Sequence, residues 1–228
     1  MDSVVINIVG LPRVVNHLEV LFWPLVFTMI LLALVRFRSP KTFVSIFRIA
    51  MNNAHMHLHL REGFNVNGIA SYLLQFNYFV VIGVLGYCIY DIFSFSKEIN
   101  WIILFVCLTA PLFFFLIKIF LVRFFAFLVE TNQGFFEYLT NYKIFFQLQG
   151  ILLLPFAVGL VFSDSQTQYY LALITISLFT FLGIFRTALS FLYAIRYGFS
   201  VLYIFLYLCT LEILPLVVIF KLFNDRIL

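Results

Sequence analysis

Residues 203–221, YIFLYLCTLEILPLVVIFK, decide which class of protein this chain belongs to. Nearly every position is apolar. At about 1.5 Å of rise per residue, a helix of this length crosses the hydrocarbon core of a bilayer, which is about 30 Å thick. One carboxylate, Glu212, lies near the middle, three residues before Pro215. A charge at that depth is costly without a partner, so Glu212 is a candidate functional residue.

The composition of the whole chain agrees with a membrane protein. Of its 228 residues, 64% are hydrophobic and only 11% are charged, whereas soluble domains carry about 25% charged residues. Aromatic residues make up 20% of the chain, including 32 Phe, which suits helices that face lipid. The formal charge of +4 comes from scattered Lys and Arg rather than from a dense basic patch, so we expect no nucleic-acid partner.

The apolar runs are continuous rather than alternating, which favours helices over a membrane barrel. We therefore expect an all-α, polytopic integral membrane protein in which residues 1–228 form a single membrane domain. Six transmembrane helices are expected, at about residues 19–35, 69–92, 101–123, 144–162, 169–193 and 201–222.

Two other segments have the pattern of interfacial helices. Within the polar stretch 36–67, apolar residues from Lys41 to Ala54 recur at helical spacing, with Arg48 on the opposite side. This pattern predicts an amphipathic helix that lies in the membrane interface. Residues 131–143 are predicted as a second interfacial segment, with Gly134 as a break.

The distribution of Lys and Arg predicts the orientation of the chain. When the loop after the first span is placed in the cytoplasm, ten of the 14 Lys and Arg fall on that side. Both termini are then expected on the opposite side of the membrane.

Arg186 in the fifth span and Glu212 in the sixth form a candidate intramembrane charge pair. They lie 12 and 14 residues from Gly198, where a tight turn is expected, or roughly 18 and 21 Å along two antiparallel helices. Facing each other would relieve much of the cost of each charge. A structural ion pair that fixes helix register is the favoured interpretation. A proton or ion relay, a substrate contact and no contact at all are the alternatives.

Three histidines, His55, His57 and His59, stand within NAHMHLHL, residues 53–60. On a helix His55 and His59 share a face, which suits two metal ligands, whereas on a strand all three would share one. No HExxH motif accompanies them, so an interfacial or phosphate-contacting role is favoured over a metal site, and pH sensing stays open. We expect no bound metal and no cofactor.

Three motifs resemble a known family. They are LREG at residues 60–63, GILLLP at 150–155 and FLYLCTLEILP at 205–215, of which the last is the most specific. Over most of the chain from about Arg36 onward, the sequence resembles multi-pass inner-membrane proteins of Bacteroidota that are known only as a domain of unknown function. The resemblance implies a helical fold in a bacterial inner membrane. In such a membrane the Lys and Arg distribution places both termini on the periplasmic side. It brings no catalytic residue.

The sequence therefore favours a non-catalytic inner-membrane subunit or assembly partner of a cell-envelope complex, with membrane lipids and other membrane-protein subunits as partners. No nucleophile, acid or base stands in a recognisable catalytic arrangement, so an enzyme is disfavoured. One alternative is a small transporter or lipid carrier that uses Arg186 and Glu212. Another is a membrane-embedded enzyme with an interfacial histidine site.

Overall fold

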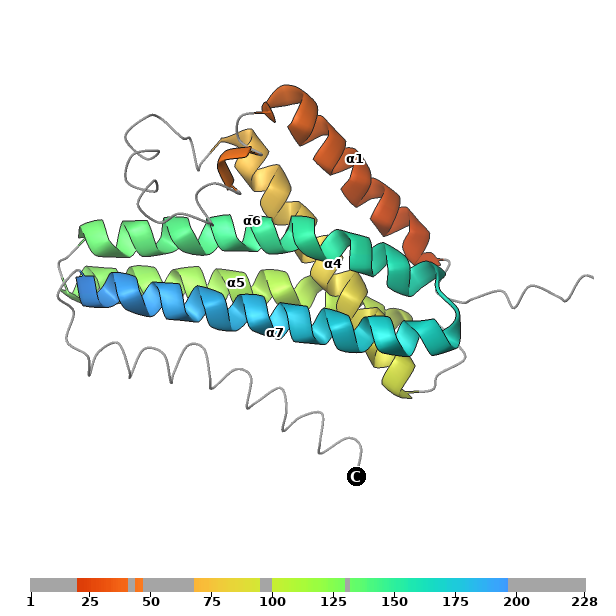
Figure 1. Cartoon of the computed structure of the whole chain (residues 1–228). Helices are drawn as coiled ribbons and strands as arrows, with labels where there is room; N and C mark the ends of the chain where they lie inside the picture. The colour runs from red at the N-terminus through yellow and green to blue at the C-terminus, as the bar shows by residue number, and fades with distance from the viewer. Residues whose placement is uncertain (1–19, 41–43, 47–67, 95–99, 130–131, 197–228) are drawn as a thin grey trace, which may run out of the picture.

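The computed structural model describes residues 20–40, 44–46, 68–94, 100–129 and 132–196. The described part contains long α-helices and no strand, so the all-helical expectation is confirmed. Figure 1 shows the five helices, which are α1 (Phe22–Arg38), α4 (Ile69–Ser94), α5 (Trp101–Val129), α6 (Asn132–Phe162) and α7 (Ser165–Arg196).

Helix α4 is the centre of the arrangement, because it contacts α1, α5, α6 and α7. It runs obliquely across α6, with which it makes its most extensive contact (Figure 1). Within the most apolar stretch of each helix, 67% of α6 residues and 61% of α4 residues are buried, against 17% in both α5 and α7. Helices α4 and α6 therefore form the interior, and α5 and α7 form the outside.

The polarity of this bundle is the reverse of that of a water-soluble protein. The outer helix α5 is the most apolar of the long helices. One of its faces is nevertheless exposed, with Phe105, Phe113 and Phe120 between 64% and 69% exposed. The inner helices bury polar side chains, namely Ser71, Gln75, Asn77, Thr140, Asn141, Gln147 and Gln149. Such a surface requires lipid as its solvent, because an apolar patch of that size in water would drive association.

Among the residues that the structure describes, four helices are long and apolar enough to cross a membrane, at Ile69–Ile92, Trp101–Arg123, Leu139–Phe162 and Gln166–Leu189. They agree with four of the six expected spans. The first expected span, 19–35, overlaps α1, whose 17 residues reach about 26 Å, so a crossing by this helix stays a prediction. Residues 201–222 lie outside the described part.

Asn100 explains why α5 begins where it does. Its side-chain Oδ1 accepts hydrogen bonds from the backbone N–H groups of Ile102 and Ile103, at 3.2 and 3.3 Å. An Asn in this position satisfies backbone donors that the first helical turn leaves without partners. The aromatic residue Trp101 follows at the end of the span, where interfacial aromatics commonly lie.

The second predicted interfacial segment, 131–143, is not a separate element of the structure. The structure places these residues, from Asn132 onward, in the first turns of α6, which continues without a break to Phe162. Gly134 does not end the helix, since a single glycine costs only about 1 kcal/mol relative to Ala. The polar residues Thr140 and Asn141 are buried inside the protein, so their polarity marks an inward-facing surface rather than the membrane interface.

Only residues 44–46 of the first predicted interfacial helix are described. Ile46 is fully buried there against the end of α1 and the first halves of α4 and α6, where its neighbours are Val35, Leu74, Ile144 and Leu148. Val44 is exposed. This segment therefore touches the bundle at Ile46, and the orientation of the remaining residues up to Ala54 stays a prediction.

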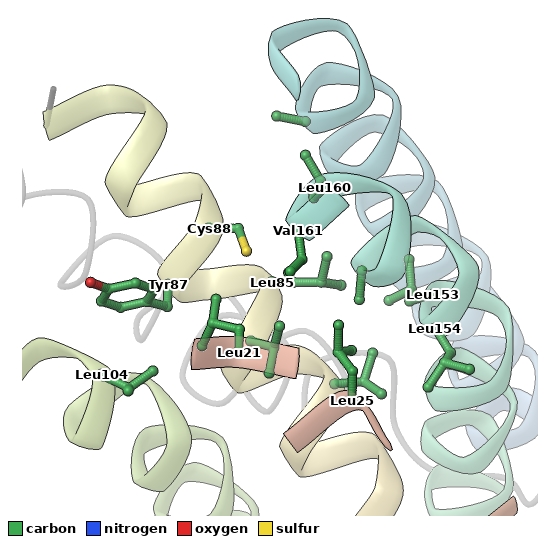
Figure 2. Close-up of a cluster of buried hydrophobic side chains, with 14 residues drawn as sticks. Leu21, Leu25, Leu85, Tyr87, Cys88, Leu104, Leu153, Leu154, Leu160 and Val161 are labelled. Carbon is green, nitrogen blue, oxygen red and sulfur yellow. The ribbon is translucent and has the colours of Figure 1, made fainter. Parts of the chain in front are cut away.

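The largest apolar core joins all five helices at the opposite end of the bundle. Figure 2 shows Leu21 and Leu25, at the start of α1, beside Leu85 of α4 and close to Leu153 and Leu154 of α6. Leu104 of α5 and Ala172 of α7 complete the same cluster. Side chains of this core hold the outer helices against α4.

Two glycines set the distances from α4 to its neighbours α5 and α6. A Cβ added to Gly83 of α4 would lie 2.8 Å from the Cα of Leu108 in α5. A Cβ added to Gly150 of α6 would lie 2.8 Å from the Cα of Tyr78 in α4. Backbones that approach this closely gain dispersion contacts, which drive helix association in lipid in place of the hydrophobic effect.

We predict that Gly83→Ala and Gly150→Ala each destabilise the protein by about 1–3 kcal/mol, because the new methyl group meets backbone atoms that cannot move aside. Thermal unfolding in detergent, followed by tryptophan fluorescence, measures the effect. Gly183→Ala is the matched control, since nothing lies within 4 Å of its added Cβ. An equal loss of stability in all three variants would contradict glycine-mediated packing.

Candidate functional site

Of the predicted site residues, only Arg186 lies in the described part of the chain. It belongs to α7, three residues before the end of the span Gln166–Leu189. Glu212 and the histidines His55, His57 and His59 lie outside the described residues, so their contacts stay predictions. The site is therefore built outward from Arg186.

The Arg186 guanidinium lies over two aromatic rings of α6. Its Cζ atom is 5.0 Å from the centroid of Tyr142 and 5.3 Å from the centroid of Phe146. Lys118, from α5, places its Nζ atom 4.4 Å from the centroid of the same Tyr142 ring. The ring of Tyr142 thus contacts one cation from α5 and one from α7.

A frame of stacked aromatic rings holds Tyr142 in place. Phe115 of α5 lies parallel to it, with centroids 6.0 Å apart, and Phe146 meets it edge-on at 4.3 Å. Phe146 in turn stacks on Tyr78 of α4 at 4.5 Å. These rings exclude water, and a cation–aromatic contact that is shielded from water is worth about 2 kcal/mol, more than at an exposed site.

The cluster lies at one end of the bundle, together with every Lys and Arg of the described residues. The carboxyl-terminal halves of α5 and α7 contact the amino-terminal half of α6 there through the rings around Tyr142. The end of α1 and the start of α4 meet the same half of α6 through Val35, Leu74 and Ile144. This basic end carries Arg36, Arg38, Lys118, Arg123, Lys143, Arg186 and Arg196.

Next to the cluster, the contact between α4 and α6 contains buried amides. The Nε2 of Gln147 donates hydrogen bonds to the backbone oxygen and to the hydroxyl of Ser71. Among the described residues, five further buried side-chain atoms of α4 and α6 have no hydrogen-bond partner, namely Gln75 Nε2, Asn77 Nδ2, Asn77 Oδ1, Gln147 Oε1 and Gln149 Oε1. Polar atoms in this state are costly in an apolar interior.

Sequence reasoning found Arg186 but not its aromatic partners. Tyr142 falls within the segment that was expected at the interface, and a single Tyr is not distinctive in a chain with 32 Phe. Lys118 was not singled out by the sequence, and its side chain is only 7% exposed. The one available signal was the spacing of Tyr142 and Phe146, which places both rings on one helical face.

No group of three or more His, Cys, Asp or Glu residues that could hold a metal ion occurs within the described residues. The two cysteines of the described part, Cys88 and Cys107, are free thiols. The chemistry that the geometry offers is therefore the attraction of negative charge by Lys118 and Arg186, and the binding of hydrogen-bonding groups by the amides.

The reversed polarity, together with four helices in the described residues that are long and apolar enough to span a bilayer, is typical of an α-helical, multi-pass membrane protein. Comparison with family profiles matches residues 21–223 to the domain of unknown function DUF4271, so the chain belongs to this family. No match was found among curated proteins, and none among solved structures.

We predict that Tyr142→Leu lowers stability by about 1–3 kcal/mol relative to Tyr142→Phe, because leucine removes the ring that Lys118 and Arg186 contact, whereas phenylalanine keeps it. Unfolding midpoints in detergent provide the comparison. Tyr169, an exposed residue of α7 at the other end of the bundle, supplies the control pair Tyr169→Leu and Tyr169→Phe, for which we expect no difference. Equal unfolding midpoints for the two Tyr142 variants would show that the aromatic ring contributes nothing to stability.

Proposed function

We propose that this protein is a non-catalytic, multi-pass subunit or assembly partner of a cell-envelope complex in a bacterial inner membrane. We also propose that the basic end of the bundle faces the cytoplasm. The positive-inside rule supports this orientation, because Lys and Arg near the ends of spans are retained on the cytoplasmic side.

The observation that carries the proposal is the direct contact of α4 with its neighbours at Gly83 and Gly150. Helices α5 and α6 continue without interruption through Pro111 and Pro155. Transporters of many families use discontinuous helices and repeats that move against each other around a central site. Continuous helices that are packed backbone to backbone suit a rigid scaffold better.

The exposed apolar face of α5 supports a partner that is itself a membrane protein. Phe105, Phe113 and Phe120 lie on this face, at spacings that bring them to one side of a helix. Aromatic side chains of this kind pack against lipid or against a helix of another subunit. We propose that a second membrane protein contacts α5 here.

A small carrier of anionic substrates is the second candidate function. The convergence of Lys118 and Arg186 on Tyr142 favours it, because cations inside a span commonly mark a substrate or ion pathway. In that case Arg186 and Glu212 would together form the ion or substrate site, which is the alternative that the sequence leaves open.

Site-specific photo-crosslinking in native membranes tests the scaffold function. With a photoreactive phenylalanine at Phe113, we expect a crosslink to one defined second polypeptide in near-stoichiometric yield. The same probe at Phe115, an inward-facing residue of the same helix that is 8% exposed, should react only within the chain. Crosslinks to lipid alone at Phe113, together with a monomeric size after mild solubilisation, would contradict the proposal.

The double variant Arg186→Met with Glu212→Leu separates the two candidate functions. A scaffold should keep its complex and restore a strain that lacks the protein, since an apolar pair can replace a structural ion pair. A carrier that needs these charges should assemble normally but fail to restore the strain.

A further inference from the structure

The outer helices α5 and α7 meet over one aromatic ring of α6. Lys118 of α5 places its Nζ atom 4.4 Å, and Arg186 of α7 places its Cζ atom 5.0 Å, from the centroid of Tyr142. The two cations are therefore at most about 10 Å apart, close enough to repel each other in a weakly screened interior. Within the described residues, α5 and α7 have no extensive contact with each other, so Tyr142 marks the line between them.

Aromatic side chains continue this line toward the middle of the membrane. Phe114 precedes Lys118 by four residues and Phe179 precedes Arg186 by seven, so each ring shares a helix face with its cation. Since α5 and α7 both point their carboxyl-terminal halves toward the basic end, the rings lie on the same side of the cations, roughly 6 and 10 Å away. Phe114 is 43% and Phe179 is 40% exposed. These four residues define the α5–α7 seam.

The chain leaves α7 near this seam. Helix α7 ends at Arg196, at the basic end of the bundle. The apolar stretch 201–222 follows after four residues, which cover at most about 14 Å even when fully extended. Since the axes of packed helices are about 8–10 Å apart, a helix formed by this stretch has to enter the membrane beside α7.

Two sides of α7 are available to such a helix. A third side is occupied by α6, where Phe185 meets Phe145. The outer side carries Phe181 and Ile184, which are 64% and 65% exposed. They precede Arg186 by five and two residues, so they point away from it. The α5–α7 seam is the other available side, and an apolar helix fits either of them.

The charge of the stretch 201–222 distinguishes the two sides. Glu212 is its single acidic residue, and a carboxylate in the hydrocarbon core is costly without a cation. Ile219 follows seven residues later, so it shares the helix face of Glu212. In an antiparallel helix this face matches the seam, because Arg186 and Phe179 are also seven residues apart. On the outer side of α7 the carboxylate would meet apolar side chains.

We propose that residues 201–222 dock as a helix along the α5–α7 seam, where Glu212 pairs with Arg186 beside the charge of Lys118. The sequence predicts the pair, and the structure adds the side of α7 on which it forms and the second cation. A guanidinium suits this role because it donates two parallel hydrogen bonds to one carboxylate. Phe113 lies on the opposite side of α5 from Lys118, so the docked helix leaves it available to another subunit.

Disulfide formation in native membranes tests the docking, in a chain whose three native cysteines are replaced by Ala. We expect Phe179→Cys with Ile219→Cys to crosslink within one polypeptide at least about tenfold faster than the control Phe181→Cys with Ile219→Cys, whose cysteines would lie on opposite sides of α7. Faster crosslinking of the control pair would place the stretch on the outer side of α7. A crosslinked dimer would assign the seam to a second copy of the chain. Either result, or no crosslink in both chains, would overturn the proposal.

A charge exchange tests the placement of Glu212 independently. Glu212→Arg should lower the amount of folded protein in the membrane at least about fivefold, because a third cation then joins Lys118 and Arg186. Adding Arg186→Glu should restore most of this loss, whereas adding Arg123→Glu, at an exposed position of α5, should not. No effect of Glu212→Arg, no restoration by Arg186→Glu, or equal restoration by the two additions would overturn the placement.

Discussion

The close approach of α4 to both α5 and α6 is the constraint on which the rest of the structure depends. In lipid, apolar side chains gain nothing by leaving their solvent, so helix association relies on dispersion contacts and on polar interactions. Gly83 and Gly150 permit the shortest of these contacts, since each lacks the Cβ that would meet the neighbouring backbone at 2.8 Å. Once α4 is held in this way, α1 packs mainly against α4 and α7 packs mainly against α6 (Figure 1).

The same constraint determines where the polar residues lie. With α4 and α6 in the interior, their amides are kept away from lipid, and Gln147 joins the two helices through Ser71. The cations at the basic end follow a different rule, since they lie near the ends of the spans, where Arg123 is exposed and Lys118 is buried over the ring of Tyr142. Tyr142 connects these two regions, because its ring belongs to the aromatic interior and its faces meet Lys118 and Arg186.

The class of the protein and four of its helices could be predicted from the sequence, because continuous apolar runs have few other interpretations. The expected boundaries at 69–92 and 101–123 agree with the observed spans. The start of α6 could not be predicted. Polar residues at 131–143 indicate either the membrane interface or an inward-facing helix surface, and only the packing of Thr140 and Asn141 against other helices distinguishes the two.

Only one residue of the candidate site could be predicted from the sequence. An Arg within an apolar run is conspicuous, so Arg186 was found, whereas the roles of Tyr142 and Lys118 depend on helices that are far apart in the sequence. The aromatic contacts of Phe115 and Tyr78 are equally hidden in a Phe-rich chain. Such contacts depend on which helices are neighbours, and hydrophobic periodicity does not specify this.

The formation of a disulfide between α4 and α5 tests most directly the claim that α4 is the tightly packed central helix. A Cβ at Gly86 would lie 3.9 Å from the Sγ of Cys107, so a rotation of the Cys107 side chain would bring the two sulfurs to bonding distance. In a chain with Cys88→Ala and Cys209→Ala, Gly86→Cys should therefore crosslink to Cys107 rapidly when native membranes are oxidised. The control Gly183→Cys, with nothing within 4 Å of its Cβ, should stay reduced. No crosslink at Gly86→Cys, or equal rates for the two variants, would contradict the account.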